Sequence, residues 1–313
     1  MQSVNQKTCV LKQDIILGIS MTASWAWGVS FAVGTSIISE KGILPFLIWA
    51  LANSAALLFF GLFILKYPVY LSFSNLWYVK VPMVIIQIFS IWINIKIMAY
   101  YTTINISIIL TAIVFVLVWI YGFNASVKRN VIQFVVLVCA LLAIIFISDS
   151  LKSNVLLMNN NLDYISWAIV GGIGLISGPF IDGQQHQRAL LAKNINPFLI
   201  GSFFFGLYMV LVLIVFYYST GFSWLLLAIT VIGLATSTLE AATSALQKLT
   251  NIKIGIIISV LALLSWEIIK SPTIADFWFW YATKRIFIVI PLCLAAIWFS
   301  RKQMETGDIN GNE

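Results

Sequence analysis

The sequence predicts an all-α membrane protein with about ten transmembrane helices. Of its 313 residues, 61% are hydrophobic and only 9% are charged, and the mean hydropathy is +1.00. A soluble domain carries about 25% charged residues, whereas a spanning helix needs about 20 apolar residues. At about 30 residues for each span and its loop, the chain holds about ten spans and no sizeable soluble domain. The lipid bilayer is therefore its first expected partner, and the cell membrane its expected location.

Apolar runs bounded by polar residues, Gly or Pro place the ten spans. They cover residues 14–38, 43–65, 78–101, 104–122, 130–149, 164–189, 197–219, 223–247, 253–270 and 281–300. A polar connection at 150–163 divides them into two units, 14–149 and 164–300, with an N-terminal segment at 1–13 and a tail at 301–313. Five spans in each unit invert the second unit relative to the first, as in inverted-repeat transporters. The run Pro-Phe-Leu-Ile, at 45–48 and again at 197–200, follows the first span of each unit.

The distribution of basic residues predicts that both termini are cytoplasmic. Twelve of the 18 Lys and Arg residues fall on the side of the N-terminus: Lys7, Lys12, Lys66, Lys80, Lys128, Arg129, Arg188, Lys193, Lys248, Lys253, Arg301 and Lys302. Cytoplasmic loops of membrane proteins are enriched in these residues, which also explains the net charge of +7 without nucleic acid as a partner. Lys284 and Arg285, at the start of the last span, lie on the wrong side for this rule.

Neither a metal centre of Cys and His residues nor a disulfide framework is expected. The chain has three scattered cysteines and one histidine. A membrane-embedded transferase that used Asp182, His186 and Glu240 is a competing hypothesis, but no paired catalytic signature supports it. We therefore expect a protein that is not an enzyme, and nothing in the sequence indicates an oligomer.

The first span contains a segment that is unusual for a simple anchor helix. Small residues and two tryptophans fill Ser24 to Gly34, in the middle of the span. Gly28 and Gly34 each lower helix propensity by about 1 kcal/mol. Close packing of helices by small residues is one explanation. The other is a discontinuous helix, whose free carbonyl groups can bind a cation.

The sixth span contains a break signal followed by polar residues. Gly178 and Pro179 interrupt the helix because Pro lacks the backbone N–H group. The polar side chains that follow, from Asp182 to Arg188, are costly if they face lipid, so we expect them to face a cavity, to pair with one another or to lie at the membrane interface. The alternative is that the helix ends near Gly183 and the rest is a cytoplasmic loop. Interrupted segments in corresponding spans of the two halves point to a binding site between them.

The eighth span carries hydroxyl groups and one acid. Side chains of this kind in membrane helices usually bond to carbonyl groups of their own helix. The adjacent Ser237 and Thr238 can instead offer hard oxygen ligands to a small cation. Glu240 is an ionisable group at membrane depth and therefore a functional candidate, with Lys96 of the third span as its expected partner.

Four segments, in order along the chain, resemble the sodium:solute symporter family, and most closely its urea-transporting branch. The first runs from Ser24-Trp25-Ala26-Trp27 to the segment Gly42–Phe46. The second is the turn at 121–133, where Gly122, Ala125 and Gln133 match the family, while Tyr121 replaces a Gly and Asn130 an Asp. The third is Asp182 with Gln187-Arg188-Ala189, where Gly183 stands in place of a Gln. The fourth is the pair Ser237-Thr238.

The resemblance implies a LeuT-type fold, shortened to a ten-helix core, that transports a small polar organic solute together with sodium. The implied sodium ligands are backbone carbonyl groups near Ser20 and Ala23, the Leu234 carbonyl, and the hydroxyls of Ser237 and Thr238. The implied solute contacts are Trp25, Trp27, Phe180, Asp182, Gln184 and Gln187. Sodium would favour the outward-facing state, and the bound solute would permit the switch inward.

A second kind of transporter remains open at this point. Ten-helix exporters of the drug/metabolite type share this length, this topology and a five-plus-five repeat. The segment Ala99–Asn105 resembles Ala245–Asn251, as such a repeat would predict. An exporter of this kind leaves the run from Asp182 to Ala189 and the turn at 121–133 unexplained.

Overall fold

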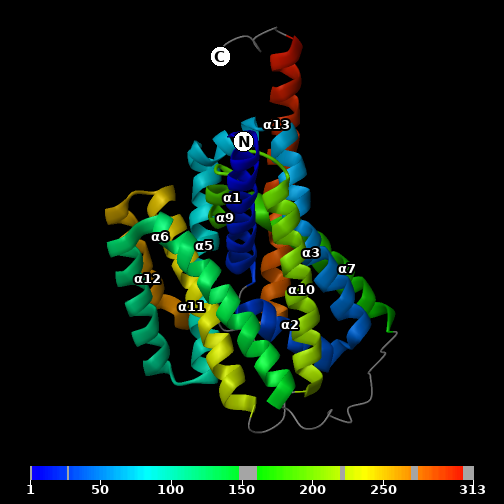
Figure 1. The fold of residues 1–313 in the computed structure, drawn as a ribbon, viewed down its shortest axis with the longest axis vertical. Helices are drawn as coiled ribbons and strands as arrows, with labels where there is room; N and C mark the ends of the chain where they lie inside the picture. Colours follow the sequence, from blue (N-terminus) through cyan, green and yellow to red (C-terminus); the bar gives the residue numbers. More distant parts are fainter. Residues whose placement is uncertain (1, 27, 148–160, 219–222, 269–273, 306–313) are drawn as a thin grey trace.

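The computed structural model describes residues 2–26, 28–147, 161–218, 223–268 and 274–305, and all of its regular elements there are helices. The long helices are α1 (Gln2–Trp25), α2 (Gly28–Lys41), α3 (Ile43–Lys66), α5 (Trp77–Tyr101), α6 (Ile104–Ile147), α7 (Leu162–Ile176), α10 (Asn196–Tyr218), α11 (Ser223–Leu249), α12 (Ile252–Ser265) and α13 (Ile274–Glu305). The short elements are α4 (Val69–Ser72), α8 (Gly178–Ile181), α9 (Gly183–Ala189) and the 3-10 turns η1 (Phe73–Asn75) and η2 (Trp266–Ile268). The helices form one bundle, in which α1 begins and α13 ends at the same end (Figure 1).

By length and composition, the structure is that of a multi-pass membrane protein. Seven stretches of the described residues are long and apolar enough to cross a membrane, and the bent pair α1–α2 makes an eighth. Two of the seven lie within α6, at Ile104–Tyr121 and Lys128–Ile147. Large apolar side chains face outward along the bundle, including Leu51 (71% exposed) and Phe287 (75% exposed), as expected of a surface that lipid covers.

The prediction of ten spans is therefore supported for seven or eight of them. The predicted eighth and ninth spans correspond to α11 and α12, which do not meet the same criterion. With 14 residues, α12 is about 21 Å long, shorter than the hydrocarbon core of about 30 Å. The 27 residues of α11 are enough for a span, but its second half carries the hydroxyl groups and Glu240.

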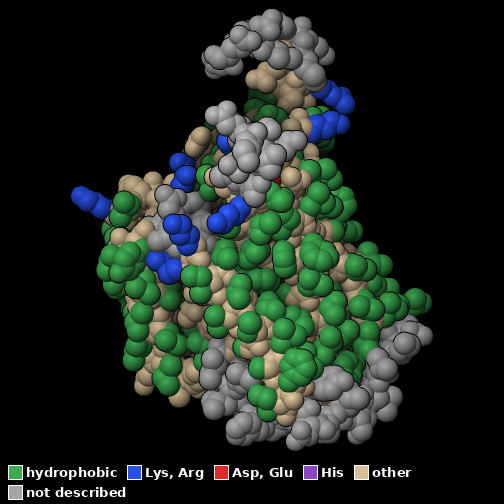
Figure 2. Space-filling view, in the orientation of Figure 1, with side chains coloured by type: hydrophobic (Ala, Val, Ile, Leu, Met, Phe, Trp, Pro, Cys, Tyr) green, Lys and Arg blue, Asp and Glu red, His purple; other side chains and the backbone are tan. Residues whose placement is uncertain are grey.

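Basic side chains gather at the end of the bundle where α1 begins. Figure 2 shows Lys and Arg at this end, while hydrophobic side chains cover the middle of the visible face. Lys12, Lys66, Lys193, Arg301 and Lys302 are all exposed. Exposed basic side chains are thus concentrated at one end of the visible face of the bundle.

Helices of the two halves pack in matching pairs. The first long helix, α1, packs against α10, and α7 packs against α3. In each half, the first span is α1 or α7 and the second span is α3 or α10. Each pair therefore joins the first span of one half to the second span of the other half, so that exchanging the halves converts one pair into the other. The contact of α1 with α6 corresponds in the same way to the contact of α7 with α13, because α6 and α13 contain the last spans of their halves. The third spans of the two halves, α5 and α11, contact each other.

Matching hydrogen bonds recur at the ends of α5 and α11. The hydroxyl groups of Thr102 and Thr250 each donate to the carbonyl four residues earlier, at 2.7 Å. The next residue, Thr103 or Asn251, accepts from the backbone N–H three residues later, at 3.4 and 2.9 Å. These hydrogen bonds make Thr103 equivalent to Asn251, whereas the sequence match aligns Asn105 with Asn251, two residues further along the first half. The repeated unit is therefore a helix end followed by the capped start of the next helix.

We expect Gly174→Ala to destabilise the bundle where α7 meets α13. A Cβ atom at this position would lie 2.7 Å from the carbonyl oxygen of Ala282 and 2.8 Å from its carbonyl carbon, and backbone atoms cannot move aside easily. Overpacking of this kind costs about 1–3 kcal/mol, which a melting curve of the detergent-solubilised protein can detect. Gly233→Ala is the matched control, because a Cβ there meets nothing within 4 Å. Equal melting temperatures for both variants would contradict this packing.

Candidate functional site

The first span is broken in its middle. The helix α1 ends at Trp25 and α2 begins at Gly28, and the two axes differ in direction by 56°. The last regular contact before the break is the hydrogen bond from Ala26 N to Thr22 O, at 2.6 Å. Carbonyl groups of the last helical turn have no partner within the helix. The discontinuous helix is therefore the correct interpretation of the small residues from Ser24 to Gly34.

The sixth span is broken twice. A first interruption at Ser177 separates α7 from α8, which begins with Gly178 and Pro179. A second one at Asp182, in an extended conformation (φ −89°, ψ 111°), separates α8 from α9. The Asp182 side chain caps α9 by accepting a hydrogen bond from Gln184 N at 2.9 Å. The interruption predicted at Gly178 and Pro179 is present but slight, because Ser177 keeps helical dihedral angles (φ −72°, ψ −15°); the extended residue is Asp182.

The polar residues after this break are buried in a short helix and do not form an exposed loop, although the preceding helix ends at Ile181, close to Gly183 as the alternative expected. Every residue of α9, Gly183 to Ala189, is buried, including Arg188, which is 0% exposed. The segment packs against α1, α5 and α11. The polar side chains therefore pair with groups of other helices, which is the lower-cost arrangement for such residues at membrane depth.

The breaks of the two spans meet in space. A Cβ atom built on Gly178 would lie 2.4 Å from the Trp25 ring, so the end of α1 touches the start of α8. Seven residues after Gly178, in α9, Gln185 Nε2 donates a hydrogen bond of 2.9 Å to Ser24 Oγ of α1. Position 178 accepts only glycine because the indole occupies the space of a side chain.

A hydrogen-bond network connects Asp182 to α5. Gln87 Nε2 donates to Asp182 Oδ1 at 3.0 Å, and Gln184 Nε2 donates to Gln87 Oε1 at 3.0 Å. All three side chains are at most 1% exposed. The second carboxylate oxygen, Asp182 Oδ2, is buried and has no hydrogen-bond partner. Gln87 was not among the predicted site residues, although a lone glutamine in the apolar third span was a signal.

Arg188 ties α9 to α1. Its Nε donates to Ser20 Oγ at 3.0 Å, and its Nη1 donates to the Gln184 carbonyl at 2.9 Å. Both contacts are fully buried, and the guanidinium also lies within electrostatic range of Asp182 and Glu240. The planar fork of donors therefore serves several partners in fixed directions.

Several acceptor atoms around the breaks remain available to a ligand. Gln184 Oε1, Gln185 Oε1 and Gln187 Oε1 are buried and have no hydrogen-bond partner. In contrast, the amide nitrogen of Gln187 donates to the Ser244 carbonyl at 3.2 Å. Unsatisfied buried acceptors are costly unless a donor fills them. Together with Asp182 Oδ2, they are acceptors that the N–H or O–H groups of a solute could satisfy.

Phe180 has a mainly structural environment. Its carbonyl accepts a hydrogen bond from the Tyr70 hydroxyl at 2.8 Å, and His186 Nε2 lies 2.6 Å away from the same oxygen. Its ring packs edge-on against Phe60, at 5.2 Å between centroids. Burial raises the pKa of Tyr70, which lies in α4 outside the spans, so its hydroxyl stays protonated and can donate. These contacts hold α8 in place against α3 and α4.

The predicted solute contacts gather near the two breaks. Trp25, Phe180, Asp182, Gln184 and Gln187 are all buried there, at the end of α1 and in α8 and α9. Trp27 lies outside the described residues. Arg285 of α13 also reaches this place, since its Nη1 lies 2.8 Å from the Cβ position of Gly178. Sequence reasoning noted this arginine only as an exception to the charge rule.

The predicted sodium ligands fit a cation only in part. Ala23 is in the last turn of α1, where carbonyl groups are released by the break, whereas Ser20 is inside the continuous helix. The Ser20 hydroxyl, moreover, accepts from the positively charged Arg188. On α11, which packs against α1 and α2, Ser237 and Thr238 are buried. Leu234 lies in the same helix, but its side chain is outside the described residues.

Ser237 and Glu240 both contact the start of the second apolar stretch of α6. Ser237 Oγ donates to Asn130 Oδ1 at 3.2 Å, which links the predicted cation ligand to the residue that replaces the family's Asp. Arg129 Nε donates to the Glu240 carboxylate at 2.6 Å, and the two groups form an ion pair. Sequence analysis suggested Lys96 as the partner of Glu240, and the structure shows an ion pair of Glu240 with Arg129, which was not predicted. The segment 121–133, predicted as a turn between two helices, is instead helical within α6, and its residues 129 and 130 contact α11.

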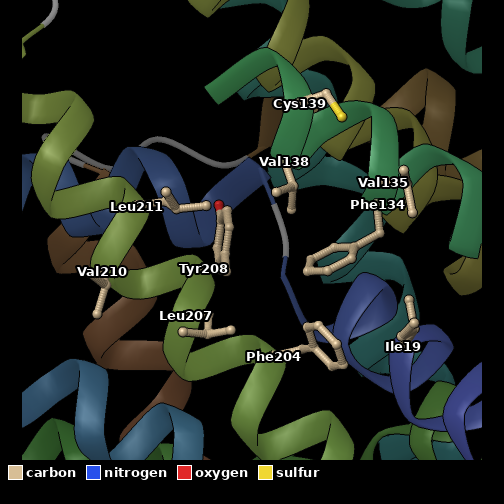
Figure 3. Close-up of a pocket in the computed structure, with 10 residues that line it drawn as sticks. All are labelled: Ile19, Phe134, Val135, Val138, Cys139, Phe204, Leu207, Tyr208, Val210 and Leu211. Carbon is tan, nitrogen blue, oxygen red and sulfur yellow. The ribbon is translucent and has the colours of Figure 1, made fainter. Parts of the chain in front are cut away.

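A separate cavity of about 360 Å³ lies between α1, α6 and α10. Its lining is almost entirely apolar and includes Phe134, Phe204 and Tyr208 (Figure 3). None of the predicted site residues lines it. Such a surface suits hydrocarbon rather than a polar solute, so the cavity is not the candidate solute site.

Comparisons with known proteins give no independent assignment. The chain matches no model of a known protein family and no curated protein. Its function must therefore be argued from the geometry of the two broken spans.

Proposed function

We propose that this chain is a secondary active transporter, which takes up a small polar organic solute by alternating access and couples uptake to sodium. The observation that carries the proposal is the meeting of two broken spans at a buried polar cluster. In transporters built from inverted repeats, discontinuous helices of the two halves form the solute site near the bilayer midplane. A protein that served only as an anchor or scaffold would have no use for these costly groups.

The fold that we propose is the LeuT-type five-plus-five inverted repeat. The paired packing of α1 with α10 and of α7 with α3 supports it, as does the equivalence of Thr102 and Thr250. The breaks in α1–α2 and α7–α9 fall in the first span of each half. The matched breaks therefore belong to the repeat rather than to two unrelated irregularities.

The solute contacts follow from the chemistry of the cluster. Asp182, Gln184 and Gln187 present buried acceptor oxygens without hydrogen-bond partners, and the Trp25 indole lies against Gly178, at the start of the preceding short helix. The Trp25 ring is held in place by its own N–H group, which donates to the Asn53 carbonyl at 3.2 Å. We propose that these residues bind and orient a solute rich in hydrogen-bond donors, and that α1 and α9 move relative to α11 to open the site to either side.

We propose a sodium site between the end of α1 and α11. Its ligands would be the Ala23 carbonyl and the hydroxyl groups of Ser237 and Thr238, hard oxygen ligands that suit sodium, with the carbonyl of Leu234. The Ser20 carbonyl is left out because it belongs to the continuous part of α1. When bound, sodium would supply a positive charge that attracts oxygen ligands of both α1 and α11. The oriented carbonyl dipoles would offset the free energy of removing water from the ion.

The clustering of basic side chains supports a cytoplasmic position of the end where α1 begins and α13 ends. We therefore propose that both termini lie in the cytoplasm of a cell whose surface membrane carries the protein. Solute and sodium would enter from the opposite face, where α2 and α3 meet.

Transport into proteoliposomes tests the proposed function. The purified chain is expected to accumulate at least one of radiolabelled urea, L-proline or D-glucose when an inward sodium gradient is applied, and to leave it chemically unchanged. Equal uptake with and without sodium, together with stimulation by a proton gradient or by exchange, would favour the drug/metabolite type of exporter. Chemical conversion of the solute would favour an enzyme.

Ser237→Ala is expected to weaken sodium dependence more than solute recognition. The substitution removes one proposed ligand oxygen and the hydrogen bond to Asn130, so the sodium concentration for half-maximal uptake should rise about tenfold. Initial rates of uptake at varied sodium and at varied solute separate the two effects. The control is Ser265→Ala, whose hydroxyl only bonds within its own helix at 2.6 Å. Equal losses of sodium-free and sodium-driven uptake in Ser237→Ala would count against this site.

A further inference from the structure

The cavity between α1, α6 and α10 opens toward the outside of the bundle. Its floor consists of buried aromatic residues, with Phe134 5% exposed and Tyr208 0% exposed. At its rim, Val135 of α6 and Val210 of α10 are 52% and 53% exposed, and Cys139 is exposed as well. Exposure of the lining residues, which Figure 3 draws, thus rises from the floor to the rim. The cavity is therefore a recess in the bundle surface.

This recess lies in the middle of two spans. On α10 its lining falls within residues 204–211, inside the apolar stretch Asn196–Tyr217. At 1.5 Å per residue, these positions are about 9 Å or more from either end of the stretch. On α6 the lining falls within residues 134–139, again about 9 Å or more from the ends of the stretch Lys128–Ile147. The medium outside the opening is therefore hydrocarbon and not water.

The lining offers contacts to hydrocarbon and almost none to a polar group. Seven of the ten lining residues are aliphatic or are the phenylalanines, and the others are Tyr208, Cys139 and Ile19. The hydroxyl oxygen of Tyr208 is buried, so this residue presents its ring. An apolar cavity of about 150 Å³ can hold a benzene molecule, and this one has a volume of about 360 Å³. The space is thus large enough for a segment of an acyl chain, which would supply the dispersion contacts that an empty cavity lacks.

We propose that the cavity is a lipid-binding site, which takes up one acyl chain of a membrane phospholipid. The bilayer supplies this ligand at the depth of the opening, and burial of its methylene groups drives binding. Because Ile19 belongs to α1, the bound chain contacts three helices and holds α1 against α6 and α10. Ile19 lies five residues before Ser24, where α1 meets α9. The lipid site therefore adjoins the broken span without sharing a residue with the polar cluster.

Photolabelling of the solubilised protein tests this site. The protein is freed from lipid in dodecyl maltoside and titrated with a phosphatidylcholine that carries a diazirine in the middle of one acyl chain. Peptide mass spectrometry then locates the labelled residues. Label on the rim residues Val135 and Cys139 is expected to saturate. Label on Phe203, which is 63% exposed and does not line the cavity, should rise in proportion to the lipid concentration.

Two filling variants and one control establish where the label binds. Val138→Trp and Leu211→Trp each place an indole in the cavity. They should lower the saturable labelling at least about tenfold, the effect of excluding two methylene groups of the chain. Val136→Trp adds the same ring to the same helix at a position that is 61% exposed and outside the lining, so it should be labelled like the wild type. If one filling variant does not fold, the other decides the question.

Three results would overturn the proposal. They are labelling of the rim residues that does not saturate, wild-type labelling in the filling variants, and oxidative cross-linking of Cys139 between two copies in the bilayer. The last result would show that a second chain covers the opening. The measurement uses neither solute nor a sodium gradient. A failure of transport would therefore leave the lipid site in place, and loss of the lipid site would leave the proposed function untouched.

Discussion

Asp182→Asn is expected to lower sodium-driven uptake by about 10- to 100-fold while leaving the fold intact. Asparagine can still cap α9 and accept from Gln87 through its side-chain oxygen, as Asp182 does at 3.0 Å. It lacks the negative charge and the second acceptor oxygen, which is the atom that the solute is proposed to use. A charge-assisted hydrogen bond is worth about 1.5–3 kcal/mol, and each 1.4 kcal/mol is a factor of ten. Initial uptake rates in proteoliposomes measure the loss.

The control for this substitution is Asp163→Asn. Asp163 lies at the exposed start of α7, in the same broken span, and its replacement by Asn removes the same charge far from the breaks. Its uptake should equal that of the wild type. If Asp182→Asn transported normally, Asp182 would be only a cap for α9. If its melting temperature fell together with uptake, the loss would have to be assigned to folding.

Arg188→Ala is expected to have the largest effect on stability. The substitution removes the hydrogen bonds to Ser20 and Gln184 and takes one of two guanidinium groups away from the buried Asp182. Breaking a buried charge pair by deleting one partner costs about 3–5 kcal/mol. The melting temperature of the solubilised protein and its yield in the membrane should both fall strongly. Arg188→Lys should rescue little, because one ammonium group cannot reach both acceptors in their fixed directions.

The control is Lys193→Ala, which removes a basic side chain four residues after the end of α9. Lys193 is exposed, so its loss should change the melting temperature by very little. A wild-type melting temperature for Arg188→Ala would show that α1 and α9 do not depend on this guanidinium. It would also weaken the proposal that the two segments move together.

The parts of the site that could be predicted from sequence are those that local chemistry decides. Gly178 and Pro179 stop a helix wherever they stand, and glycines in the first span weaken it in the same way. The cost of polar groups in lipid predicted that the run from Asp182 onward avoids lipid, and the structure shows that it is buried among other helices. These are properties of neighbouring residues, and the structure has both breaks where the sequence indicates them.

The parts that could not be predicted depend on contacts between distant residues. Gln87 and Asp182 are 95 positions apart, and Arg129 and Glu240 are 111 apart, so no periodicity relates them. The ion pair of Arg129 with Glu240 depends on how α6 docks on α11. Arg285 was placed at the start of the last span, and its approach to Gly178 depends on how α13 packs against α7 and α8.

The central claim is that the two broken spans form a site that opens alternately to the two sides of the membrane. A single cysteine at Ser24, in a background with Cys9, Cys139 and Cys293 replaced by serine, reports on this site, because Ser24 is buried where α1 meets α9. Its labelling by a membrane-impermeant maleimide can be measured from each side of proteoliposomes. We predict that sodium raises labelling from outside and lowers it from inside, relative to potassium. Labelling from one side only under both conditions, or changes of the same sign on both sides, would contradict alternating access.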